Sequence, residues 1–223
     1  MSAASYVAAT GAMAAGKTTV ARTLARELGW MCLEEDFEAN PFLTSFVRDP
    51  ASCAFETELT FLLLHCSQLR SALRESRAPV IVSDFCLMQD LWYAELNLTS
   101  RELALFKSVY AHLSGLARQP DAVIVLHATT DLLMSRVAER NRSVEAGISR
   151  QYVESLNAQV ERGARELPSS ATVHVNMDAS DILADPAAAE GLLRRVGCAL
   201  RSRGPVSADG ADNRPRHRSH LEE

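Results

Sequence analysis

The sequence lacks the features that mark secreted, membrane-spanning and nucleic-acid-binding proteins. Its 5 cysteines, an odd number, show no Cys-x-x-Cys spacing, so we expect neither a disulfide framework nor a zinc site. No apolar run is long enough to span a membrane, and no basic segment precedes the first apolar stretch, so no signal peptide is expected. A net charge of -5 argues against polymeric nucleic acid as a partner. These absences together indicate a cytoplasmic protein.

The chain is long enough to bury one full hydrophobic core. It has 223 residues, of which 47% are hydrophobic and 23% charged, as in a single globular domain. From about Arg201 the sequence turns to Arg, Ser, Gly, Pro and Asp, with almost no large apolar residues. We therefore predict one domain over residues 1–200 and a disordered tail over residues 201–223.

Short apolar runs alternate with helical patterns along the chain. Such alternation predicts an α/β fold of three layers, with a five-stranded parallel sheet flanked by helices. The expected strands are Tyr6–Thr10, Trp30–Leu33, Val80–Ser83, Ala122–Leu126 and Ala171–Val175. The expected long helices are Phe55–Arg74, Thr99–Arg118 and Ser149–Arg165, and a shorter one is expected to begin at Asn40 and Pro41.

A glycine-rich loop joins the first strand to the first helix. Residues 11–18 read Gly-Ala-Met-Ala-Ala-Gly-Lys-Thr and fit the pattern G-x-x-x-x-G-K-[ST]. In this pattern backbone N–H groups bind phosphate oxygens, the lysine adds charge near the β- and γ-phosphates, and the hydroxyl binds Mg²⁺. Val20, Leu24 and Leu28 then repeat every four residues, so the loop opens a helix. The sequence predicts a nucleoside triphosphate site of the P-loop NTPase type. Its expected residues are Gly11, Ala12, Met13, Ala14, Ala15, Gly16, Lys17, Thr18 and Thr19.

Acidic residues follow the second and third strands, at the sheet edge where ligands of such folds bind. Four acids lie between Glu34 and Glu38, and one of them would orient or deprotonate an acceptor hydroxyl, unless they form a solvated loop. Asp84 ends the third strand, where it would help to bind Mg²⁺, cap the next helix, or do both.

Three arginines and an acid follow the fourth strand in the pattern Arg136-x-x-x-Arg140-x-Arg142-x-x-Glu145. Arg136 and Arg140 lie one helical turn apart, so both would reach triphosphate oxygens if the segment closes over the site. In that case we expect Arg140 and Arg142 to gain partners only when a triphosphate is bound. The alternative is a basic helix surface that pairs with Glu145.

These motifs, in this order, resemble the deoxynucleoside kinases, the family of deoxyadenosine, deoxyguanosine and deoxycytidine kinases. The resemblance rests on the phosphate loop, the stretch from Glu35 to Leu43, the acid after the third strand and the arginine pattern. The segment from Asp84 to Leu98 is also similar to a bacterial branch that is sometimes fused to a pterin pyrophosphokinase. The resemblance implies ATP- and Mg²⁺-dependent phosphorylation of a nucleoside 5′-hydroxyl by a homodimer built from long helices.

On the phosphate side, the resemblance implies that Lys17 and Thr18 hold the phosphates and Mg²⁺, with Asp84 helping to place the metal. Arg136 and Arg140 would act in catalysis with Lys17, and Arg142 would complete the lid.

On the acceptor side, the resemblance implies that Glu35 is the base for the 5′-hydroxyl. Asp90 would contact the nucleobase, and Glu145 would meet the 3′-hydroxyl of the sugar.

The acceptor side also departs from the family pattern at four positions. Phe85 and His65 stand where the family usually has arginines, Glu58 replaces a base-reading glutamine, and Val47 replaces a sugar-contacting tyrosine. An ionised Glu58 only accepts hydrogen bonds, which favours purines with a donor edge, whereas a Glu58–His65 pair would close the pocket to a nucleobase.

Two other functions remain open at this point. One is a kinase of a non-nucleoside alcohol on the same fold, and the other is a nucleotide-binding protein with little catalysis.

Overall fold

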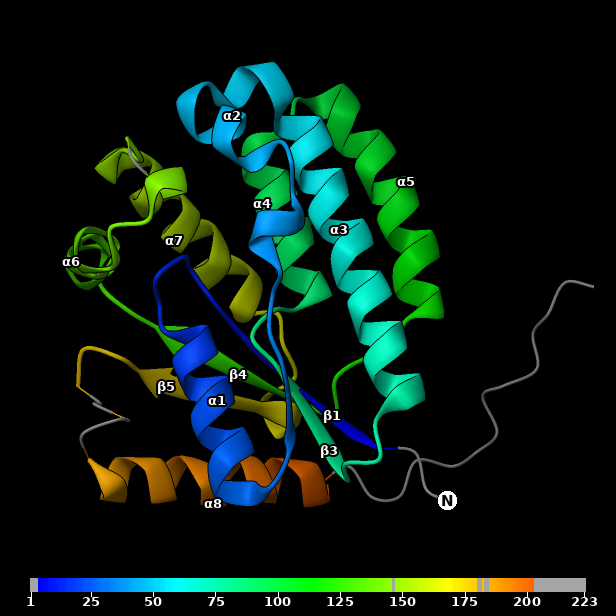
Figure 1. The fold of residues 1–223 in the computed structure, drawn as a ribbon, viewed down its shortest axis with the longest axis vertical. Helices are drawn as coiled ribbons and strands as arrows, with labels where there is room; N and C mark the ends of the chain where they lie inside the picture. The colour runs from blue at the N-terminus through cyan, green and yellow to red at the C-terminus, as the bar shows by residue number, and fades with distance from the viewer. Residues whose placement is uncertain (1–3, 146, 180–181, 183–184, 203–223) are drawn as a thin grey trace, which may run out of the picture.

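The computed structural model describes residues 4–145, 147–179, 182 and 185–202, and its centre is a five-stranded parallel sheet (Figure 1). The strands lie in the order β2-β3-β1-β4-β5, and every neighbouring pair is parallel. Their bounds are β1 Ser5–Gly11, β2 Met31–Leu33, β3 Val80–Ser83, β4 Ala122–His127 and β5 Thr172–Asn176. The predicted fold class is confirmed, and the predicted strands are confirmed to within one residue at each end.

Eight α-helices and three short 3-10 helices surround or connect these strands within the described residues. The α-helices are α1 Lys17–Leu28, α2 Leu43–Arg48, α3 Pro50–Glu75, α4 Leu87–Asn97, α5 Ser100–Leu116, α6 Thr130–Arg140, α7 Arg150–Ala164 and α8 Pro186–Ser202. The 3-10 helices are η1 Phe37–Ala39, η2 Ser143–Glu145 and η3 Ser169–Ala171.

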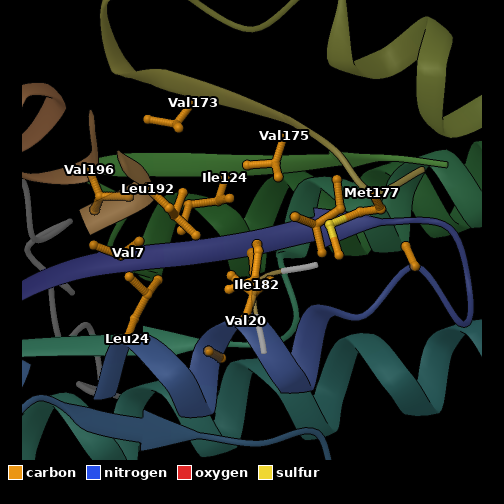
Figure 2. Close-up of a cluster of buried hydrophobic side chains, with 14 of the residues drawn as sticks. Val7, Val20, Leu24, Ile124, Val173, Val175, Met177, Ile182, Leu192 and Val196 are labelled. Carbon is orange, nitrogen blue, oxygen red and sulfur yellow. The ribbon is translucent and has the colours of Figure 1, made fainter. Parts of the chain in front are cut away.

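The two faces of the sheet are covered by different helices because successive side chains of a strand point to opposite faces. Along β1, Val7 belongs to the core shared with α1 and α8, while Tyr6 belongs to the core shared with α3. Figure 2 shows the first of these cores, in which Ile124 of β4 lies among side chains of α1 and α8. On the other face, Val125 of β4 packs with residues of α4 and α7. Every strand residue from Tyr6 to Gly11 is buried, as expected of a central parallel strand.

The start of α2 differs from the prediction. The helix begins at Leu43, with Phe42 before it and no side-chain cap. Asn40 lies in the preceding turn, where its Nδ2 donates to the carbonyl of Thr57 at 3.0 Å and its Oδ1 accepts from the N–H of Phe42 at 3.1 Å. Asn40 thus fastens the chain to α3 and ends η1, instead of capping α2.

The helix α3 is longer than predicted, since it begins at Pro50 and continues through a kink at Cys53. Proline is favoured at a first helical position, which explains the earlier start. At the other end of the chain, Arg201 is still helical in α8, so the predicted tail does not begin there. The remainder of that prediction, residues 203–223, lies outside the described residues.

Among the described residues, none of the helices has both the length and the apolar character needed to cross a membrane.

Candidate active site

A cavity of about 770 Å³ opens where the loops that follow β1, β2 and β3 meet. This volume is typical of small-molecule sites. The cavity brings together most of the residues that the sequence marked as candidates. Those that line it are Met13, Ala14, Gly16, Lys17, Thr18, Thr19, Val47, Glu35, Glu58, His65, Asp84, Asp90, Arg136, Arg140, Arg142 and Glu145. Gly11, Ala12, Ala15 and Phe85 are buried behind this lining.

The phosphate loop has a backbone shape that its glycines allow. Gly16, at the N-terminus of α1, has φ 103°, and Ala14 also has a positive φ of 60°. A Cβ atom on Gly11 would lie 2.9 Å from the carbonyl oxygen of Leu126, so β4 can approach only a glycine there. No side chain caps α1, which leaves the N–H groups of its first turn to a ligand. The loop therefore presents the anion-binding end of a helix to the cavity.

Two positively charged side chains donate hydrogen bonds to the backbone of this loop. Lys17 donates from Nζ to the carbonyls of Gly11 at 3.0 Å and Ala12 at 3.1 Å, and Arg136 donates to the carbonyl of Ala15 at 2.8 Å. Burial lowers the pKa of Lys17, while the carboxylates of Glu35 and Asp84 act against this effect. Positive charge is thus placed beside the helix N-terminus.

Asp84 joins the phosphate loop to the loop after β2. Its Oδ2 accepts from the Thr18 hydroxyl at 2.5 Å, and its Oδ1 accepts from the backbone N–H of Glu35 at 2.6 Å. Burial raises the pKa of Asp84, and these two hydrogen bonds oppose the rise. The alternative role as a helix cap is wrong, because α4 begins at Leu87 with Cys86 in the capping position. A hydroxyl and a carboxylate at the edge of a phosphate site form a donor set that fits Mg²⁺.

The ring of His65 lies between two carboxylates. Nε2 is 3.1 Å from Oε1 of Glu35, and Nδ1 is 2.9 and 3.0 Å from the two carboxylate oxygens of Asp90. Phe85 stacks on the ring with centroids 4.3 Å apart and planes 9° from parallel. The possible pair between His65 and Glu58 is therefore wrong, since both ring nitrogens face other partners.

Glu58 lies deeper in the cavity, where it accepts a hydrogen bond from Nδ2 of Asn97 at 2.6 Å. Burial, aided by the nearby charge of Asp90, raises the pKa of Glu58 to about 8 even though the bond from Asn97 lowers it. Burial thus favours a protonated Glu58 at neutral pH, where the sequence suggested an ionised one. A protonated carboxyl has both a donor and an acceptor, as a glutamine amide does.

The lid arginines already have partners. Arg140 pairs with Glu145, with Nε 2.6 Å from Oε2, and the guanidinium of Arg142 lies 4.4 Å above the centroid of the Phe37 ring. The expectation that these arginines gain partners only with a triphosphate is therefore wrong. Arg140 nonetheless lines the cavity, so pairing with Glu145 does not turn it away from the site.

Sequence reasoning missed several cavity residues on α4 and α7. Gln89 accepts from the Thr10 hydroxyl at 2.9 Å and the Gly11 N–H at 3.2 Å, which fastens α4 to the phosphate loop. Tyr93 follows one turn later and lines the cavity, and Asn97 one turn after that also hydrogen-bonds Tyr152 of α7 at 3.2 Å. Polar residues spaced four apart on a helix were the signal available in the sequence.

Comparisons with known proteins agree with this geometry. The family model described as deoxynucleoside kinase matches residues 7–200. Deoxyguanosine kinase of Bacillus subtilis (strain 168) is 26% identical over 189 residues, which are 82% of this chain and 91% of that protein. Deoxyadenosine kinase of Dictyostelium discoideum is 28% identical over 156 residues, 68% of this chain and 63% of its own length.

A solved structure shows the same fold. Deoxyadenosine kinase from M. mycoides with bound dATP superimposes with a TM-score of 0.74 at 22% identity, over 86% of this chain and 99% of that chain. The family match spans most of the chain and agrees with the resemblance seen in the motifs. The chain therefore belongs to the deoxynucleoside kinase family, whose members are phosphotransferases that act on a nucleoside hydroxyl.

Proposed function

We propose that this protein transfers the γ-phosphoryl group of ATP to the 5′-hydroxyl of a deoxynucleoside, with Mg²⁺ and with purines favoured. The observation that carries the proposal is the position of Asp84, which hydrogen-bonds both the Thr18 hydroxyl and the backbone of Glu35. One carboxylate thus links the phosphate loop to the acid beside the acceptor space. Donor and acceptor are held next to each other, which is most of what phosphoryl transfer requires.

The phosphate side neutralises charge in this mechanism. The N–H groups of the loop, Lys17 and Arg136 bind the triphosphate, and Arg140 approaches from the lid. Thr18 and Asp84 would hold Mg²⁺, which supplies positive charge to the phosphates when bound.

The acceptor side orients the attacking oxygen. Glu35 accepts the proton of the 5′-hydroxyl while that oxygen forms its bond to the γ-phosphorus and the bond from phosphorus to the bridging oxygen breaks, releasing ADP. Glu145 faces the same cavity from η2, and we assign it to the 3′-hydroxyl. The nucleobase would lie between Val47 and Glu58, whose protonated carboxyl offers a donor and an acceptor to a purine edge.

We also propose that the enzyme is a cytoplasmic homodimer. Large apolar side chains are exposed on two long helices, Leu63 on α3 at 50% and Leu105 and Leu116 on α5 at 56% and 61%. We infer that these leucines belong to one apolar patch that a second copy of the chain covers. All five cysteines are free thiols, which fits a reducing compartment. Sedimentation of the purified protein tests the dimer, and a monomer at micromolar concentration would contradict it.

The activity is tested by incubating purified protein with ATP and Mg²⁺ and a panel of deoxyribonucleosides, ribonucleosides and pterin-like alcohols, while ADP release is followed. We expect turnover with deoxyadenosine and deoxyguanosine to exceed that with thymidine. Lys17→Ala is the negative control. We expect its turnover to fall about 10²-fold or more, because the variant lacks the positive charge beside the transferring phosphoryl group. Turnover only with a non-nucleoside alcohol would support the alternative kinase. ATP binding without turnover would support the binding protein.

A further inference from the structure

We propose that His65 is a positioning residue, a doubly protonated ring that is clamped by Asp90 and Phe85 and that fixes the carboxylate of Glu35 for the acceptor hydroxyl. The inference rests on the proposed function, because it takes Glu35 as the group that meets the hydroxyl. It assigns His65 to the carboxylate of Glu35, where the sequence had placed it among the residues that touch the substrate.

With Asp90 and Glu35 ionised, the geometry indicates which protons the ring carries. An ionised carboxylate has only acceptor oxygens, so each ring nitrogen that faces one must carry a proton. Nδ1 of His65 faces both oxygens of Asp90, and Nε2 faces Oε1 of Glu35. A neutral imidazole would turn a lone pair toward one of the two carboxylates. The imidazolium is therefore the form that satisfies both contacts.

The charges around the ring support this state. Burial alone would lower the pKa of His65, but the charges and hydrogen bonds of Asp90 and Glu35 raise it to about 10. Glu58 on α3 is the other titratable group that interacts with the ring, and Lys17 lies beyond Glu35. The pKa of Glu35 is lowered by His65 and by Lys17 in spite of its burial.

Rigidity separates this arrangement from an ordinary buried ion pair. The side chain of His65 is 2% exposed and that of Asp90 5%, whereas that of Glu35 is 30% exposed and lines the cavity. Phe85 stacks on the ring at 4.3 Å, and the Phe61 ring lies 5.7 Å from it, so the ring cannot tilt freely. All three side chains line the cavity, and that of Glu35 is the most exposed of them.

The clamp determines which oxygen of Glu35 is available. Oε1 is held by His65, and no other hydrogen bond to this carboxylate occurs within the described residues. Oε2 is thus left for the acceptor. The bond from His65 thus holds Glu35 as a fixed hydrogen-bond acceptor for the hydroxyl. This suits a phosphoryl transfer whose rate depends on orientation more than on proton abstraction.

The test compares His65→Gln with His112→Gln, a matched control on the exposed face of α5. A glutamine amide donates from one atom only and would present its oxygen to one of the two carboxylates. We expect kcat for the deoxynucleoside to fall about 10²-fold in His65→Gln, with the KM for ATP within twofold, and no change in His112→Gln. An unchanged kcat in His65→Gln, beside a large loss in Glu35→Gln, would overturn the clamp and leave the proposed function intact.

Asp90→Asn provides a second variant that keeps the shape of the clamp. The amide oxygen still accepts from Nδ1, but the charge is gone, so Nε2 of His65 loses its proton at lower pH and then repels Oε1 of Glu35. We expect kcat of Asp90→Asn to fall between pH 7 and pH 9 relative to the parent. A constant ratio of the two rates across this range would contradict the clamp.

A direct measurement does not depend on activity. Nitrogen-15 NMR of the parent ring should show both nitrogens of His65 protonated from pH 6 to pH 8.5, with His112→Gln used to assign the exposed histidine signal. A ring with one unprotonated nitrogen at pH 7 would overturn the proposal even if His65→Gln failed to fold. Failure of the proposed function would appear instead as absent turnover in the parent, with the ring still doubly protonated.

Discussion

Thr18 and Asp84 are 66 residues apart in the chain, yet the hydroxyl of the first donates to the carboxylate of the second at 2.5 Å. The contact spans the start of α1 and the end of β3, so it exists only when these two elements are docked. Both oxygens belong to groups that suit Mg²⁺.

Asp84→Asn tests this contact. The amide oxygen of the variant can still accept from Thr18, but the negative charge of the carboxylate is lost. We therefore expect kcat to fall about 10²-fold at low Mg²⁺ and to recover in part as the Mg²⁺ concentration is raised. Initial rates over a Mg²⁺ series measure the effect. Asp131→Asn, at a side chain that is 81% exposed on α6, is the control and should leave the Mg²⁺ dependence unchanged. The same Mg²⁺ dependence in both variants would remove Asp84 from the metal site.

Glu35→Gln tests the group that meets the acceptor. We expect kcat to fall by roughly 10² to 10⁴, the range for loss of a general base, while ATP affinity is nearly kept. The control is Glu34→Gln, because Glu34 pairs with Arg22 at the surface and its side chain is 40% exposed. Steady-state kinetics of both variants measure kcat, and nucleotide titrations measure their affinity for ATP. A larger loss at Glu34 would shift the catalytic role to that residue.

Glu58 should couple stability and selectivity to pH. Its pKa is raised from 4.5 to about 8 in the folded protein, so the unfolded chain releases this proton first as pH rises. The free energy of unfolding therefore falls between about pH 5 and pH 8, by at most about 1.4 kcal/mol per pH unit, and this contribution levels off above pH 8. Glu58→Gln lacks this slope, so it should gain stability relative to the parent as pH rises. Denaturant titrations at several pH values measure the difference, with Glu56→Gln as the exposed control.

The same titration should alter acceptor choice. Below pH 8 the parent and Glu58→Gln both offer a donor and an acceptor, and their preference for purines over thymidine should agree. Above pH 8 the parent carboxylate only accepts, and we expect its selectivity to differ from that of the variant by about 1 to 3 kcal/mol. Ratios of kcat/KM at pH 7 and pH 9 measure this. Identical profiles at both pH values would exclude Glu58 from recognition.

Gly163 provides a test of packing away from the chemistry. A Cβ atom there would lie 2.1 Å from the Trp92 ring, so Gly163→Ala must push α7 from α4 or displace the indole. We expect a loss of about 1–3 kcal/mol in the free energy of unfolding. Gly191→Ala in α8 is the matched control, since a Cβ there meets nothing within 4 Å and alanine should stabilise the helix by about 0.5–1 kcal/mol. Equal stability of the two variants would contradict the close packing.

Strands and the phosphate loop were predictable because their signals are local. A buried parallel strand is a short apolar run bounded by turn residues, and Gly11 to Thr18 carry their pattern within eight positions. The start of α2 was not predictable, because Asn40 is recruited by the Thr57 carbonyl, which only the folded chain brings near. The local preference of asparagine for a helix N-cap was overridden by this tertiary contact.

The partners of His65 show the limit of sequence spacing. Glu58 lies on the same face of α3 as His65, so the sequence suggested it as a partner. The observed partners are Asp90 from α4 and Glu35 from the loop after β2. No spacing rule links three elements separated by long stretches of chain. The protonation of Glu58 was equally hidden, since it depends on how deeply the carboxyl is buried.

The position of β1 in the middle of the sheet has a consequence for synthesis. β1 pairs with β3 on one side and β4 on the other, and Gly11 rests against the backbone of Leu126. The phosphate loop therefore leaves the ribosome early but is complete only after β4 has followed, on the order of 5 to 20 s later at ordinary rates of synthesis. A nascent chain that ends before β4 contains the sequence of the phosphate loop but lacks the strand that pairs with β1 beside it. Nucleotide thus cannot guide the first steps of folding and binds only when the sheet has closed around β1.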